Sequence, residues 1–225
     1  MAANRSTTAD RRARIEEMRR AEQARERRTR ILTVGISAVV VLGLVGFGGW
    51  VINKENKEQE QQEAAAKAPI QGEKSWDAKK LTRNHVNTPV KYEMTPPVGG
   101  DHHPVWQNCN GDVYDKPVND TNAVHSLEHG AVWVTYNKKA AAADLDKLKS
   151  KVKKTPYSLM SPVDGQSGAI MLSAWGKQVT VDSATDPRVD AFFTKYVNGP
   201  QTPEPGAACT GGVGAEGMGG AGMGQ

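Results

Sequence analysis

The sequence predicts a membrane-anchored α+β protein with one N-terminal transmembrane helix, a helical stalk and a small extracytoplasmic domain with a mostly antiparallel sheet. Three observations lead to this prediction. Residues 31–52 form an uncharged apolar run. Residues 53–68 have high helix propensity and almost nothing to bury. Residues 72–200 mix helical periodicity with short strands joined by hairpin signals, which is typical of an α+β domain.

The apolar run predicts an uncleaved membrane anchor. Its 22 positions exceed the ~20 residues that cross a hydrocarbon core, and Trp50 lies at one end, as an interface anchor should. A cleaved signal peptide is the competing interpretation, but its apolar region would be about 7–15 residues long and would end in a small-residue cleavage site. We therefore expect residues 31–52 to contact membrane lipid.

The charges on either side of this run predict its orientation. Residues 1–30, expected to form a basic helix, contain ten arginines and five acidic residues, whereas the rest of the chain has 19 basic and 20 acidic residues. The positive-inside rule then places the N-terminus in the cytoplasm and the chain after residue 52 outside it. The excess of basic over acidic residues is confined to the first thirty residues, so anionic lipid head groups are the expected partner and nucleic acid is not.

Beyond the anchor, residues 53–71 are expected to form the stalk and linker, and 72–200 the only region able to build a core. Helices are expected at residues 140–154 and from Asp186 to Tyr196, where Asp186 and Pro187 provide a helix start. The expected strands cover residues 90–94, 131–136, 157–160, 169–175 and 178–182, the last two joined at Gly176. Residues 201–225 are rich in glycine and are expected to be disordered.

A short helix that carries two histidines is the main candidate for a functional site. Asp120 or Thr121 can cap it, and Gly130 can end it in the left-handed conformation. His125 and His129 then lie one helical turn apart, with Cβ atoms roughly 6 Å from each other, which suits two imidazoles that bind one metal ion.

A loop upstream of this helix provides further histidines. Pro104 favours an extended His103, so the rings of His102 and His103 should point apart and one of them should face the helix. His102 would complete a three-histidine site with the helix pair, and His85 is a candidate fourth ligand. Imidazole ligands suit zinc or copper. The alternative is that these histidines only hydrogen-bond carbonyls and carboxylates of the loop.

The two cysteines of the chain allow two interpretations. A disulfide between Cys109 and Cys209 would close a loop of about 100 residues, for which the chain-entropy model gives roughly 4.7 kcal/mol. Alternatively, Cys109 is a metal ligand and Cys209 is free.

Two segments resemble a known family. H-V-N-T-P-V-K-Y-E-M-T-P-P-V-G-G-D-H begins at His85, and A-V-H-S-L-E-H-G-A-V-W-V-T-Y begins at Ala123. They are similar to a largely actinobacterial family of membrane-anchored proteins, classed as a domain of unknown function, with P-P-x-S-G-x-H and V-H-x-L-E-H-G motifs. The resemblance selects His102 as the loop histidine, and Gly99 replaces the serine of the motif. It implies a domain boundary and an anchor but no activity.

These observations leave three candidate functions. The first is an extracytoplasmic metal-binding module that serves metal delivery or an oxidoreductase. The second is an accessory subunit of a membrane complex, for example a respiratory one, with structural histidines. The third is a zinc hydrolase, because H-S-L-E-H fits H-x-x-E-H and Glu128 would activate water. Gly130 ends the helix early, which disfavours this third candidate. The zinc site of such a hydrolase also needs a distant carboxylate ligand, for which Glu204 is the downstream candidate.

Overall fold

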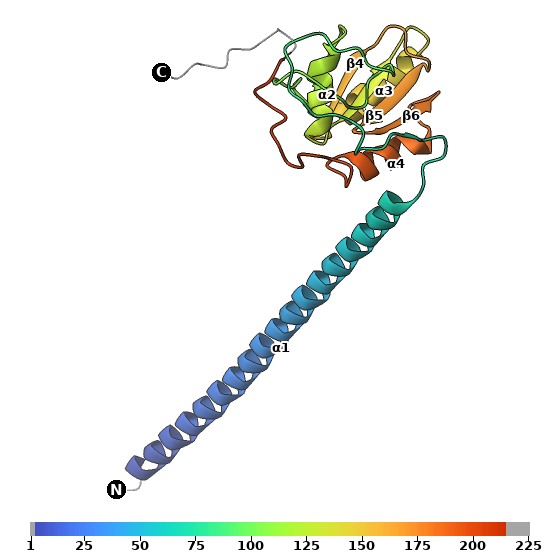
Figure 1. Cartoon of the computed structure of the whole chain (residues 1–225). Helices are drawn as coiled ribbons and strands as arrows, with labels where there is room; N and C mark the ends of the chain where they lie inside the picture. The colour runs from blue at the N-terminus through green and yellow to red at the C-terminus, as the bar shows by residue number, and fades with distance from the viewer. Residues whose placement is uncertain (1–2, 215–225) are drawn as a thin grey trace, which may run out of the picture. The chain divides into compact units, whose positions relative to one another are not determined.

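The computed structural model describes residues 3–214, and for residues 3–10, 36–41, 55–56 and 58–67 it describes only the backbone. Residues 1–2 and 215–225, which include much of the expected glycine-rich tail, lie outside the described part. The chain divides into two compact units, Met1–Glu60 and Gln61–Gln225. The elements are α1 Ala3–Lys67, β1 Lys74–Ser75, β2 Asn110–Val113, α2 Asp120–Glu128, β3 Val132–Tyr136, α3 Ala142–Lys153, β4 Ser158–Pro162, β5 Ile170–Ala174, β6 Lys177–Val181 and α4 Pro187–Tyr196. Figure 1 labels the helices and strands β4, β5 and β6.

The N-terminal region is helical, but the predicted membrane span is not supported. Helix α1 is continuous through the expected basic helix, apolar run and most of the stalk. Within the described residues, no helix is long and apolar enough to cross a membrane. Within the expected span, the structure describes the side chains of residues 31–35 and 42–52 only, and neither segment reaches the ~20 residues that a span requires. The predicted transmembrane helix and the single-pass membrane location are corrected accordingly.

The second unit is α+β, as predicted, but its sheet is mixed rather than mostly antiparallel. The strand order is β1-β6-β5-β3-β4-β2. The β1/β6, β6/β5 and β5/β3 pairs are antiparallel, whereas β3/β4 and β4/β2 are parallel. Parallel neighbours need a crossover connection, and α3 provides it between β3 and β4.

Side chains alternate along the strands and build one core on each face of the sheet. Val132 and Val134 of β3 face the core that α3 and α4 cover, together with Leu148 and Phe192. Trp133, between the two valines, faces the opposite core. That second core also contains apolar side chains of α2, namely Ala123, Val124 and Leu127. The sheet therefore separates an α3/α4 face from an α2 face.

The structure of this unit differs from the sequence predictions in several places. Residues 90–94 are not a strand, although their exposure alternates, and they lie between Pro89 and Pro96. Strand β2 was not expected, because Gly111 and Asp112 are poor strand formers. Residues 201–214, part of the expected disordered tail, pack along the domain, where Val213 bridges to Gln107. The hairpin at Gly176 and helices α3 and α4 are confirmed.

Candidate metal centre

Helix α2 provides the rigid base of the site. Its N-cap is Asn119, one residue before the expected caps, and the Asn119 side chain accepts a hydrogen bond of 3.0 Å from the Thr121 backbone N–H. After the last helical residue and the C-cap His129, Gly130 takes the predicted left-handed conformation, with φ of +100°. A Cβ at this position would lie 2.4 Å from Asn198 Oδ1, so glycine also permits the C-terminal segment to approach. Both ends of α2 are therefore fixed.

Two loop segments that run side by side contribute the other histidines. His85 and His102 form an isolated bridge, in which the Val86 N–H donates to the His102 carbonyl at 2.7 Å. The His102 N–H in turn donates to the Asn84 carbonyl at 3.0 Å. Asp101 reinforces the pairing by accepting from the side-chain amide of Asn84 at 2.9 Å. These bonds place the two imidazoles next to each other over α2.

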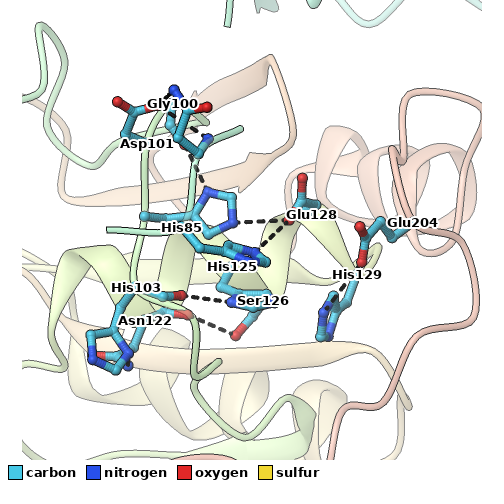
Figure 2. Close-up of polar contacts among 12 residues, drawn as sticks. His85, Gly100, Asp101, His103, Asn122, His125, Ser126, Glu128, His129 and Glu204 are labelled. Carbon is cyan, nitrogen blue, oxygen red and sulfur yellow. Dashed lines mark hydrogen bonds and ion pairs between the residues drawn. The ribbon is translucent and has the colours of Figure 1, made fainter. Parts of the chain in front are cut away.

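Three imidazoles and one carboxylate converge where these segments meet α2. His85, His102, His125 and Glu128 each offer one ligand atom, and these atoms all lie within 4.8 Å of one another. Oε2 of Glu128 lies 2.9 Å from Nε2 of His102 and 3.7 Å from Nε2 of His85. A tetrahedral ion with bonds of ~2.1 Å separates its ligand atoms by ~3.4 Å, a value between these two distances. Figure 2 shows His85, His125 and Glu128 together at the centre of the group.

Backbone carbonyls hold two of the rings in the orientation that metal ligands require. Nδ1 of His102 donates to the Gly100 carbonyl at 2.7 Å, and Nδ1 of His125 donates to the His103 carbonyl at 2.7 Å. A carbonyl only accepts, so each Nδ1 must carry its proton and each Nε2 is directed into the cluster. Metal-binding histidines use this same outer hydrogen bond.

Burial and mutual contacts set the charge of the group. Burial lowers the pKa of His125 to about 4, so its imidazole is neutral near pH 7. Burial also acts to lower the pKa of His102, but its bonds to the Glu128 carboxylate and the Gly100 carbonyl outweigh this effect and raise it. Burial acts to raise the pKa of Glu128, and its bond with His102 and the adjacent imidazoles lower it. The space between His102 and Glu128 therefore suits a proton or a metal cation.

His129, predicted as a ligand, lies beside this group and outside it. Its ring packs edge-on against His125, with ring centroids 4.4 Å apart. Its Nδ1 donates to the Ala208 carbonyl at 2.7 Å, and its Nε2 lies 3.9 Å from Oε2 of Glu204 (Figure 2). Burial lowers the pKa of His129, so it too is neutral near pH 7.

His103 has a structural role, and its ring points away from the cluster as predicted (Figure 2). Its Nδ1 accepts from the Val105 backbone N–H at 3.0 Å and lies 3.2 Å from the Asn122 side-chain amide. The ring thus holds its own loop, while the His103 carbonyl holds His125.

The cysteines form a disulfide between Cys109 and Cys209, 100 residues apart in the sequence, so Cys109 is not a metal ligand. The Cys109 N–H also donates to the Cys209 carbonyl at 2.8 Å. Ala208, whose carbonyl accepts from His129, is the residue before Cys209. The disulfide therefore keeps the C-terminal segment against the end of α2.

The structure brings together His102, His125 and His85 of the predicted ligands and leaves His129 outside. It adds Glu128, which the sequence predicted as a neighbour of the ligands or as the base of a hydrolase but not as a ligand. The spacing contained a signal for this role, because residues at i and i+3 of a helix share a face, and Glu128 follows His125 by three positions.

Residues 85–211 match the family described as protein of unknown function DUF3105. This match covers more than half of the 225 residues, so the chain belongs to that family. All four side chains of the cluster and both cysteines fall inside the matched range. No curated protein and no solved structure matches the chain.

Proposed function

We propose that the domain binds one transition-metal ion, zinc or copper, through Nε2 of three histidines and a carboxylate oxygen of Glu128. The histidines are His85, His102 and His125. The observation that carries the proposal is their convergence with Glu128 within 4.8 Å. A set of three imidazole nitrogens and one carboxylate oxygen suits both ions.

The burial of Glu128 gives the cluster an attraction for positive charge. Its side chain is 2% exposed, and its Oε2 lies 2.9 Å from Nε2 of His102. A buried carboxylate costs several kcal/mol unless a positive charge compensates for it. A divalent ion would supply that charge to all four side chains at once and would displace the proton between His102 and Glu128.

The same geometry argues against the hydrolase that the H-x-x-E-H pattern suggested. That mechanism requires the two histidines of the motif to bind zinc while the glutamate stays free to activate water. Here Glu128 belongs to the cluster and His129 does not. The role of accessory subunit of a larger complex stays a prediction, because no described contact bears on a partner.

Elemental analysis of the purified full-length chain after dialysis against Zn²⁺ or Cu²⁺ tests the proposal. We expect one equivalent of metal in the wild type and loss of tight binding in His125→Ala. Glu128→Gln should weaken binding by at least the ~10-fold that loss of an outer hydrogen-bond partner costs, because the amide is a poorer and uncharged ligand.

His129→Ala is the matched control, since it removes an adjacent imidazole that lies outside the cluster. It should keep the full equivalent of metal. The proposal is contradicted if the wild type takes up neither ion, or if His129→Ala and His125→Ala reduce binding equally.

A further inference from the structure

Exposure divides the four proposed ligands into two kinds. His102, His125 and Glu128 are 0%, 3% and 2% exposed, whereas the side chain of His85 is 46% exposed. The cluster therefore meets solvent at the ring of His85. An ion held by the other three side chains would be covered on the outside by this one imidazole.

The hydrogen bonds divide the ligands in the same way. Carbonyls hold His102 and His125 through Nδ1, and Glu128 belongs to a helix fixed at both ends. Among the described residues, no hydrogen bond holds the ring of His85. That ring stacks on His125 with centroids 4.8 Å apart and planes inclined by 18°, and its Nε2 lies 3.7 Å from Glu128.

The backbone of His85 is fixed although its ring is not. The bonds of the neighbouring Val86 and Asn84 to His102 hold the chain on both sides of His85. Rotation about the side-chain torsions can thus carry the imidazole off the cluster while the backbone stays in place. In contrast, displacing His125 would break its bond to the His103 carbonyl inside the core.

We infer that His85 is the exchangeable ligand and that the ion enters and leaves the site on its side. This inference rests on the proposed function. In the exchange, the bond from Nε2 of His85 to the metal breaks, and a bond from an external nitrogen donor to the metal forms. Both donors are neutral and bring their own electron pair, so the charge of the site and the oxidation state of the ion are unchanged. The site would then pass its ion to an acceptor that presents an imidazole.

The test measures Zn²⁺ release from the full-length chain to an excess of a chromogenic chelator, with and without imidazole. His85→Ala should still bind one Zn²⁺ but release it at least ~10-fold faster than the wild type, since loss of even an outer hydrogen-bond partner of a ligand weakens metal affinity by about that factor. Imidazole should slow release from His85→Ala by filling the open position, and should speed release from the wild type by competing with His85. His129→Ala, which removes an imidazole that lies outside the cluster, should match the wild type in both conditions.

Release from His85→Ala at the wild-type rate, or without any response to imidazole, would overturn the inference while leaving the metal site itself intact. Loss of all Zn²⁺ from His85→Ala would also overturn it, because His85 would then be as essential as His125. Circular dichroism of each variant separates these results from unfolding. If the wild type takes up no metal, the proposed function fails and this inference fails with it.

Discussion

The two faces of the central sheet bury different kinds of side chain. The core under α3 and α4 consists of aliphatic and aromatic residues, for example Val134, Leu172 and Phe192. The α2 face buries His102, His125 and Glu128 beside its apolar residues. Burial of apolar area stabilises a fold directly, whereas burial of imidazoles and a carboxylate costs free energy that specific partners must offset. The α3/α4 face thus serves stability, and the α2 face serves the site.

The largest effect is expected from removing the disulfide on the α2 face. Cys109→Ser combined with Cys209→Ser opens a loop of 100 residues, which should lower the free energy of unfolding by about 4.7 kcal/mol in the chain-entropy model. Urea unfolding measures it, and reduction of the wild type should give the same loss. A loss under about 1 kcal/mol would show that other contacts already hold the C-terminal segment.

On the other face, Phe192→Ala should cost about 3–5 kcal/mol, because it leaves a cavity at a fully buried position. Urea unfolding measures the loss. The folded variant should still bind one equivalent of metal, since Phe192 is separated from α2 by the sheet. Loss of metal from folded Phe192→Ala would break the division between the two faces.

The pH dependence of the metal-free chain should be dominated by the α2 face. In the unfolded chain, His125 takes up a proton near the ordinary histidine pKa of about 6.5, whereas in the folded chain it does so only near pH 4. The free energy of unfolding should therefore fall by about 1–3 kcal/mol as the pH drops between these two values. His129 acts in the same direction. His102 acts in the opposite direction, because its pKa is raised in the folded chain. Its contribution to the free energy of unfolding is present below pH 6.5 and is lost as the pH rises through that raised pKa.

Urea unfolding at pH 5, 6.5 and 8 measures this profile, which should peak near pH 6.5. His125→Gln should flatten the acid side of it. A profile that is the same in the wild type and in His125→Gln would mean that His125 does not titrate differently in the folded chain.

The smallest effect compares a helix cap on each face. Asn119→Ala and Asp186→Ala each remove a side chain that caps the first turn, of α2 and α4 respectively, at a cost of about 1 kcal/mol. Only Asn119→Ala should also weaken metal binding, because α2 carries His125 and Glu128. Thermal unfolding and metal titration of both variants check this, and equal metal affinities would count against the dependence of the site on α2.

Local signals predicted much of the second unit and little of its sheet order. Asp186 and Pro187 identify the start of α4, and Gly176 identifies a hairpin, because these residues act through their immediate neighbours. The pairing of β2 with β4 joins residues about fifty positions apart in the sequence. Strand β2 also contains Gly111 and Asp112, which are poor strand formers, so no local signal predicted it. The N-terminal apolar run predicted a membrane span that the described residues do not support.

The site was predictable where helix geometry decides it. The i,i+4 spacing correctly placed His129 beside His125, but their rings meet edge-on and only His125 joins the cluster. The Ala208 carbonyl, 79 residues away in the sequence, fixes the ring of His129, and no local pattern could predict that contact. Glu128 joins the cluster in place of His129, because Glu128 lies, like His125, on the face of α2 that meets the loops of His85 and His102.

X-ray absorption spectroscopy of the metal-loaded full-length chain tests the central claim most directly, because it counts the imidazoles bound to the ion. We expect three imidazole nitrogens at ~2.0–2.1 Å together with one oxygen from Glu128. Two imidazoles are expected in His85→Ala and three in His129→Ala. A wild-type spectrum with fewer than three imidazoles, or the loss of one in His129→Ala, would contradict the ligand set of His85, His102, His125 and Glu128.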